Sequence, residues 1–211
     1  MLKRLLIVAI LVCLLGCSGA RDVRQPAENQ ASPSCKGDLT ADEYAAYSAL
    51  LLHKFSGGQL VISDYTGTAP KPSSKSSYDT WASDHWQRCE AMIPPSEPSM
   101  LAQFRNRNSQ PHALARHFDL PDYLLVTSEE IKKRMGYDIN KPGGGGVGEV
   151  YPDAVGVFSF SSVGFNEGRK RAVVYVVRGA CGRGCGEGFC VLLSKENCEW
   201  KVEKAATFWM G

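Results

Sequence analysis

The sequence has almost no excess of charge of either sign. Its 24 Lys and Arg residues stand against 22 Asp and Glu residues, so the formal net charge is +2. Lys3 and Arg4 lie in a leader that we expect to be removed, and the rest of the chain then carries 22 charges of each sign. A chain without excess positive charge does not attract a polyanion. We therefore predict that nucleic acid is not a partner.

The sequence also lacks the motifs of several enzyme classes. It has no Gly-x-Ser-x-Gly elbow for a hydrolytic serine, and its Gly-rich stretch at 143–148 is not followed by the Gly-Lys-Ser/Thr of a phosphate-binding loop. Histidine is scarce, with four residues spread along the chain: His53, His85, His112 and His117. Asp84-His85 could belong to a hydrolytic triad, but the sequence indicates no nucleophile for it. We predict no catalytic residue, no cofactor and no metal site.

A run of about 20 apolar residues, which a membrane-spanning helix needs, is likewise missing. The chain instead opens with Lys3 and Arg4, followed by an apolar run of only 11 residues at 5–15. A short positive segment before a short apolar stretch is typical of a cleaved secretion signal. We therefore predict a signal peptide over residues 1–16, and membrane attachment must come from another source.

The end of this leader, Leu14-Leu15-Gly16-Cys17, resembles the lipobox of bacterial lipoproteins. The resemblance implies that the Cys17 thiol receives a diacylglycerol and that cleavage makes Cys17 the first residue. Two or three acyl chains such as palmitate hold one residue firmly to a membrane, since each buried methylene contributes about 0.8 kcal/mol. Ser18 follows, and the sorting rule of this class then favours the outer membrane, because Asp there signals retention. We predict a lipid-anchored, periplasm-facing protein of the bacterial cell envelope.

The segment after Cys17 differs in composition from the rest of the chain. Residues 17–37 are polar, contain Pro26 and Pro33 and have almost no large apolar side chains. Such a segment cannot bury enough surface to offset its ordering entropy, so we predict a disordered tether that reaches roughly 25 Å. Residues 38–211 are long enough for a single domain with its own core.

The spacing of apolar residues predicts the elements of this domain. Thr40 and Glu43 form a capping box for a helix that Gly57-Gly58 ends. Strands are predicted at 59–65 and 123–126, and a helix at 127–135, with one or two short helices around Trp81, Trp86 and 100–104. The last third holds four strands and a short fifth: 154–161, 171–178, 188–194, 198–203 and a segment with Phe208 and Trp209. Because the connections are short, we predict an α+β fold with N-terminal helices packed on a C-terminal antiparallel β-meander.

Six cysteines are left once Cys13 leaves with the signal and Cys17 is lipidated: Cys35, Cys89, Cys181, Cys185, Cys190 and Cys198. An even number in an oxidising compartment predicts disulfides. If Glu196-Asn197 is a two-residue turn, Leu193 faces Trp200 and Cys190 lies opposite Glu203, roughly 16 Å along the ladder from Cys198. Bridged Cα atoms lie within about 7 Å, so a Cys190–Cys198 bond is not expected.

Cys181 and Cys185 enclose Gly182-Arg183-Gly184, which can turn tightly, and we favour a bridge between them. Cys35 and Cys89 then pair with Cys190 and Cys198 in one of two ways, and either way joins the helical half to the sheet. The alternative is a redox function for Cys181 and Cys185, since Arg183 favours a thiolate and a small-ring disulfide is easily reduced. The CxxxC spacing, instead of CxxC, argues against it.

Several segments resemble a family of uncharacterised bacterial exported proteins and lipoproteins. The resemblance is densest in Ser162-Val163-Gly164-Phe165-Asn166. It extends to other segments in the same order: Leu39-Thr40-x-x-Glu43-Tyr44, Val61-Ile62-Ser63-Asp64, the strand 172–177, Cys181-Gly182, Cys185-Gly186-x-Gly188, 191–193, Trp200 and Trp209. Cys190 and Cys198 depart from the pattern, because the family more often has an aromatic residue and a hairpin glycine there. The resemblance supports the fold and implies no activity.

The functional prediction is accordingly a membrane-anchored binding or interaction module rather than an enzyme. Its partners are the membrane, through the lipid on Cys17, and an unidentified envelope protein or ligand. A thiol–disulfide redox protein that uses Cys181 and Cys185 is the first alternative. A hydrolase that uses His85 or His112 is the second, and it requires a cleft that gathers the histidine with an acid and a nucleophile.

Overall fold

The computed structural model describes residues 39–55, 57–70, 77–135, 150–179 and 186–211. The predicted signal, tether and lipidation site at Cys17 lie outside these ranges, as do Cys35, Cys181, Cys185 and the Gly-rich loop. The described residues from 39 onward belong to a single compact unit of the chain. No helix among them is both long and apolar enough to cross a membrane.

The helices lie close to where the apolar spacing places them. Their bounds are α1 (Leu39–Lys54), α2 (Ser77–Glu90), α3 (Pro98–Arg107) and α4 (Ser128–Met135). The predicted cap of α4 is present, since the Glu130 backbone N–H donates to the Thr127 hydroxyl at 3.0 Å. In α1, Tyr44, Tyr47 and Leu51 are buried at the predicted helical spacing.

The strands form one mixed sheet of seven, in the order β2-β1-β3-β5-β6-β7, with β4 paired to β5. Their bounds are β1 (Gln59–Ser63), β2 (Tyr123–Val126), β3 (Ala154–Phe160), β4 (Gly164–Phe165), β5 (Arg171–Gly179), β6 (Glu187–Glu196) and β7 (Glu199–Met210). The meander β3-β5-β6-β7 is antiparallel, as predicted. The sheet does not end there, because β1 pairs parallel with both β2 and β3. The α+β class is confirmed, and the sheet is larger and mixed.

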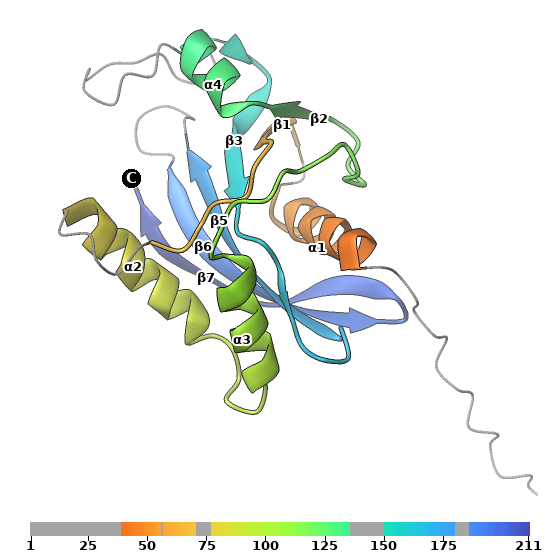
Figure 1. Ribbon diagram of the computed structural model, residues 1–211. Coiled ribbons are helices and arrows are strands. Elements are labelled where there is room, and N and C mark those ends of the chain that lie inside the picture. The colour runs from red at the N-terminus through yellow and green to blue at the C-terminus, as the bar shows by residue number, and fades with distance from the viewer. Residues whose placement is uncertain (1–38, 56, 71–76, 136–149, 180–185) are drawn as a thin grey trace, which may run out of the picture. The chain divides into compact units, whose positions relative to one another are not determined.

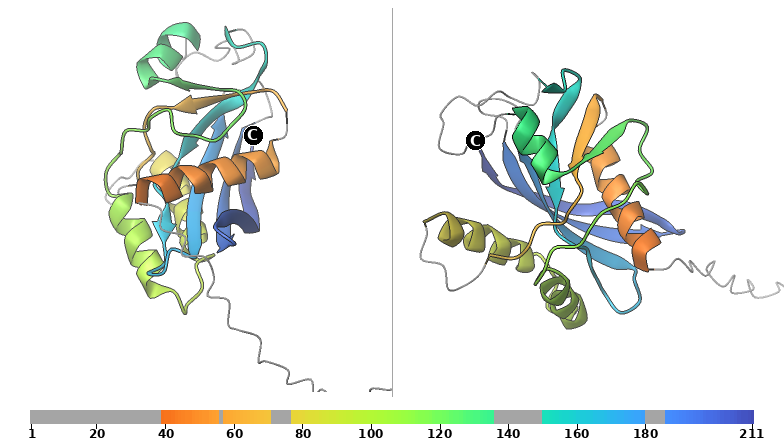
Figure 2. Two further views of the ribbon diagram at one scale, coloured as in Figure 1. Left: turned by 90° about the vertical axis from the view of Figure 1, so that its right-hand side faces the viewer. Right: turned by 45° about the horizontal axis from the view of Figure 1, so that its top comes forward.

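Helices cover both faces of the sheet (Figure 1 and Figure 2). The side chains of α1 pack with Val174, Val176 and Leu193 on one face. The side chains of α2 and α3 pack on the other face with Val173 and Leu192, which directly precede Val174 and Leu193 in sequence. Because successive strand residues point to opposite faces, strands covered on both sides need continuous apolar runs. This explains the unbroken apolar stretches of β5 and β6.

The β6–β7 hairpin turns one residue later than predicted. Glu196 pairs with Glu199, so the turn is Asn197-Cys198, and both residues have positive φ, 50° and 69°. A two-residue turn of this kind needs positive φ at both central positions, which Asn accepts far better than Glu. Leu193 consequently lies opposite Val202 instead of Trp200. The predicted fourth and fifth strands of the last third are one strand, β7, and the two-residue strand β4 was not predicted.

Candidate functional site

A disulfide joins α2 to the centre of the sheet. Cys89 and Cys190 are bonded with their Cα atoms 5.4 Å apart, across a sequence separation of 101 residues. The prediction of disulfide bonding is thereby confirmed, and this bond belongs to one of the two pairings left open. Cys190 is therefore not joined to Cys198. The register predicted for Cys190 is wrong, because Cys190 lies opposite Ala206 and not Glu203.

Cys198 is also disulfide-bonded. Since Cys89 and Cys190 are joined to each other, its partner is a cysteine outside the described residues. The favoured Cys181–Cys185 bridge and the redox alternative that depends on it lie outside the described residues as well. Both stay predictions.

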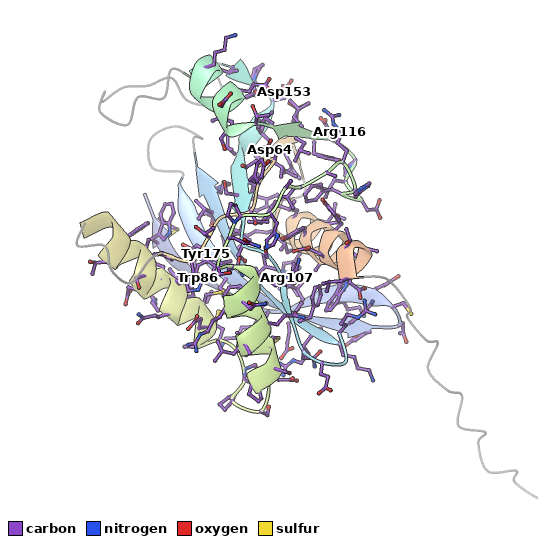
Figure 3. The ribbon with its side chains drawn as sticks, viewed as in Figure 1. Asp64, Trp86, Arg107, Arg116, Asp153 and Tyr175 are labelled. Atoms are coloured by element: carbon purple, nitrogen blue, oxygen red, sulfur yellow. A yellow bond between two sulfur atoms is a disulfide. The ribbon has the colours of Figure 1, made fainter. Side chains whose placement is uncertain are left out.

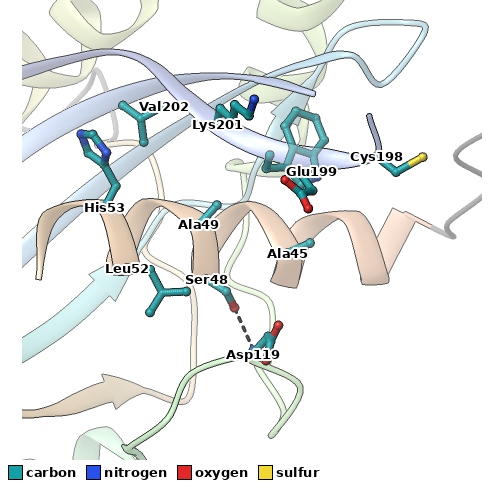
Figure 4. A pocket seen from close by; sticks show the side chains of 11 residues that line it. Ala45, Ser48, Ala49, Leu52, His53, Asp119, Cys198, Glu199, Lys201 and Val202 are labelled. Carbon is teal, nitrogen blue, oxygen red and sulfur yellow. Dashed lines mark hydrogen bonds between the residues drawn. The ribbon is translucent and has the colours of Figure 1, made fainter. Parts of the chain in front are cut away.

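A groove lies between α1 and the beginning of β7 (Figure 4). Its volume is about 730 Å³, and it is open to solvent along its length. Its apolar lining comes from both elements: Ala45, Ala49 and Leu52 of α1, and Trp200 and Val202 of β7. Leu52 is 49% exposed, so part of this apolar lining faces solvent. The groove is therefore an apolar surface that this domain does not cover.

The rim of the groove carries charges of both signs, from Asp119, Glu199 and Lys201, and His53 lies beside them. Lys201 donates to the Glu196 carboxylate at 2.9 Å, and this hydrogen bond raises the pKa of Lys201. Ser48, at the base, accepts a hydrogen bond from the Asp119 backbone N–H at 2.9 Å. A nucleophilic serine needs a base that accepts its proton, and the described residues give Ser48 none.

A smaller hollow of about 390 Å³ adjoins the groove. It lies beside the first two turns of α1 and shares Ala45 and Asp119 with the groove, while Tyr44 and His117 form its other side. The two rings are packed edge to face with their centroids 5.2 Å apart. The uncovered surface of α1 thus extends along most of the helix.

The segment from Ser162 to Asn166 is a structural junction. Val163 is fully buried, its N–H donates to Glu43 Oε1 at 3.0 Å, and its carbonyl oxygen accepts from Arg107 Nη1 at 3.1 Å. Arg107, at the end of α3 (Figure 3), forms an ion pair with Glu43 at 2.7 Å, so α3 and α1 hold the same residue between them. The Tyr47 hydroxyl lies 2.9 Å from Glu43 Oε1, and burial raises the pKa of Tyr47 well above its usual value. Tyr47 therefore stays a protonated hydrogen-bond donor.

The neighbouring residues of this segment have equally specific partners. The Ser162 backbone exchanges two hydrogen bonds with the Asn108 side chain, at 2.7 Å and 3.0 Å. The Phe165 N–H donates to Gln103 of α3. Asn166 Oδ1 accepts from the backbone N–H groups of Lys170 and Arg171, which closes the turn that follows. These contacts satisfy backbone groups of the segment and hold it between α3 and the sheet.

The histidines proposed for a hydrolytic centre are not assembled into one by the described residues. His85 is 5% exposed, its ring lies edge to face with Trp81 and stacks on Phe208, and neither nitrogen has a hydrogen-bond partner. Burial lowers the pKa of His85, so the ring is neutral at neutral pH. His112 Nε2 lies 2.9 Å from the Arg107 carbonyl oxygen. Neither ring hydrogen-bonds a carboxylate or a hydroxyl within the described part of the chain.

Sequence reasoning missed the groove. It identified the buried stripe of α1 at Tyr44, Tyr47 and Leu51, but it did not use the second apolar stripe beside it. Ala45, Ala49 and Leu52 recur at the same helical spacing; Ala45 and Leu52 are exposed, and Ala49 is half-buried at the edge of the core. A helix that packs against one sheet needs a single apolar stripe. The second stripe on α1 was therefore the sequence feature from which the groove could have been predicted.

No family model matches the chain, and no curated protein or solved structure matches it either. The resemblance to the exported family stays a prediction. The function is therefore argued from the groove and from the leader.

Proposed function

We propose that this protein is a lipid-anchored binding module of the bacterial cell envelope, and that its groove takes an extended segment of a partner protein. Two observations support the placement in the envelope. The leader ends in a lipobox-like sequence with Cys17, and the domain holds disulfides at Cys89–Cys190 and at Cys198. Disulfides persist in oxidising compartments and are rare in the cytosol.

The observation that supports strand binding is the position of the groove beside a sheet edge. β7 is the last strand of the sheet, and among the described residues it pairs with β6 alone. Its outer N–H and C=O groups can therefore pair with an extended chain laid beside them. Recognition by strand addition obtains affinity from such main-chain hydrogen bonds and specificity from pockets for alternate side chains. The groove provides an apolar pocket of this kind at the beginning of β7.

The side chains of the groove define what the bound segment presents. Ala45 and Ala49 are small, so they leave room between the helix and the strand for a side chain of the partner. Leu52 and Val202 make that space apolar, and Glu199 and Lys201 place one charge of each sign at the rim. An extended segment with an apolar residue between two polar ones fits this arrangement. Both charges of the rim then remain in water, where they set orientation and cost little.

The anchor is tested by replacing the residue that would carry the lipid. In cells fed an alkyne-tagged palmitate, the wild-type protein is expected to incorporate the tag and to sediment with membranes. The Cys17→Ser variant is expected to lose the tag completely and, if exported, to appear in the soluble fraction. Cys13→Ser is the matched control, because it alters the leader and leaves the tag in place. A wild-type protein that takes up no acyl chain contradicts the anchor.

The groove is tested by filling it. Ala45→Trp replaces an exposed alanine of α1 and places an indole in the groove. Ala102→Trp is the matched control: it replaces an exposed alanine of α3, on the opposite face of the sheet and outside the groove. A photoreactive residue in place of Leu52 is expected to cross-link one envelope protein in the Ala102→Trp background. In the Ala45→Trp background, the yield of that cross-linked product is expected to be at least tenfold lower.

The cross-linked segment, made as a synthetic peptide, gives the decisive measurement. On binding, it is expected to slow hydrogen exchange at the outward-facing amides of β7 and to leave those of α3 unchanged. Binding that protects α3 instead, or a cross-link that both tryptophan variants retain, contradicts strand addition to β7.

A further inference from the structure

The disulfide at Cys198 can be assigned from the positions of the described elements. Cys198 lies at the β6–β7 turn and lines the groove, at the end where α1 begins (Figure 4). The cysteines outside the described residues are Cys13, Cys17, Cys35, Cys181 and Cys185. Bridged cysteines have Cα atoms within about 7 Å, so each candidate can be judged by its chain reach.

Cys181 and Cys185 are excluded by the length of β6. Cys185 lies two residues before Glu187, and Cys181 lies three residues after Arg178, so both are within about 11 Å of the sheet end where Arg178 pairs with Glu187. Cys198 lies beyond Glu196, at the opposite end of the ten-residue strand. At about 3.3 Å per residue, the two ends are roughly 30 Å apart. Neither cysteine can approach Cys198 closely enough.

Cys35 is placed within reach by α1. It precedes Leu39, the first residue of α1, by four residues, which span at most about 14 Å. The first turn of α1 lies over the hairpin, because the Asp42 carboxylate pairs with Lys195, two residues before the turn. Ala45, one turn further along, lines the same groove as Cys198. The beginning of the helix and the turn are therefore neighbours.

We infer that Cys198 is joined to Cys35. The exclusion of Cys13 and Cys17 rests on the proposed function, in which the first leaves with the signal and the thiol of the second holds the lipid. The bond forms when both thiols give up their hydrogen atoms to a protein disulfide of the envelope's thiol-oxidising machinery, which is thereby reduced to two thiols. The S–S bond that results links the end of the tether to the hairpin turn.

The bond determines where the domain is attached to its anchor. The free tether is then 18–34, whose root-mean-square length as a flexible chain is roughly 20–25 Å. The chain leaves the domain at the hairpin turn, at one end of the groove, and not at the start of α1.

Peptide mapping of the full-length protein purified from membranes tests the assignment. After free thiols are alkylated, trypsin without reductant is expected to release residues 25–36 linked to residues 196–201, with the mass of the pair less two hydrogen atoms. Reductant must separate the two. In Cys35→Ser, the Cys198 thiol becomes alkylated, whereas Cys181→Ser leaves the linked pair intact.

Each other result decides against the assignment. Linkage of residues 196–201 to 179–183, to 184–195 or to the peptide with Cys17 overturns it, and so does an alkylated Cys198 in the wild-type protein. The acylation state of Cys17 is read from the same digest. An unmodified Cys17 beside an intact Cys35–Cys198 bond would contradict the lipid anchor and leave the disulfide assignment standing.

Discussion

Arg107→Met is expected to lower the free energy of unfolding by about 3–5 kcal/mol, because it leaves the Glu43 carboxylate buried without its cation. The two side chains are 17% and 10% exposed and lie 2.7 Å apart. Arg107 also donates to the Val163 carbonyl oxygen, so the variant removes a hydrogen bond to a fully buried residue. Denaturant unfolding followed by tryptophan fluorescence measures the change.

Arg105→Met is the matched control, two residues away on the same helix. Arg105 forms a bidentate pair with Glu90, but its side chain is 60% exposed, and an exposed pair contributes about 0–1 kcal/mol. The double variant Glu43→Gln/Arg107→Met should recover part of the loss, since it removes the uncompensated charge. Equal effects of Arg107→Met and Arg105→Met would show that the Glu43 pair does not hold α1 and α3 together.

The antiparallel half of the sheet could be predicted because its information is local. Strands β5, β6 and β7 are separated by short connections, and their apolar runs are uninterrupted. The parallel pairing of β1 with β2 and β3 could not be predicted in this way. β1 ends at Ser63, whereas β2 begins at Tyr123 and β3 at Ala154, so the pairing joins segments 60 to 90 residues apart. The local pattern of apolar residues does not indicate which distant strand pairs with β1.

The hairpin shows a limit of a different kind. Apolar alternation requires only that Leu193, Trp200 and Val202 share a face, and a register shift of two residues keeps them there. The burial pattern is therefore equally compatible with a turn at Glu196-Asn197 and with one at Asn197-Cys198. The backbone decides, because both central residues must adopt positive φ, and Asn is favoured for that conformation. The residue preferences of the turn, and not the hydrophobic pattern, would have predicted the correct register of the hairpin.

The candidate site was predicted less well than the fold. Cys198 was identified as a disulfide residue, but its place at the end of a groove depends on how α1 crosses the sheet, which sequence spacing does not define. The segment from Ser162 to Asn166 was recognised as a pattern without a physical reason. Its contacts with Asn108, Arg107 and Glu43 come from two helices distant in sequence. These residues therefore form a packing junction between the helices and the sheet.

Gly164 is the residue of this junction whose replacement gives the second large effect. A Cβ atom at Gly164 would lie 2.5 Å from Phe104 Cβ and 2.9 Å from the Phe104 Cα, well inside van der Waals contact. Phe104 is fully buried on α3 and stacks on Trp86 of α2, so it cannot move away alone. Gly164→Ala must therefore push α3 from the sheet, and we expect a loss of about 1–3 kcal/mol in the free energy of unfolding.

Gly168→Ala separates this steric effect from the general consequences of removing a glycine. Gly168 is exposed four residues later, and the nearest atom to a Cβ there is Lys170 Cγ at 3.9 Å, so its replacement should change stability by less than about 0.5 kcal/mol. Phe104→Leu in the Gly164→Ala background removes part of the ring system that α3 must displace. If the contact with Phe104 causes the loss, the double variant is less unstable than the sum of the single variants by more than about 0.5 kcal/mol. Strict additivity would mean that Gly164 is required for its backbone and not for the close approach of α3.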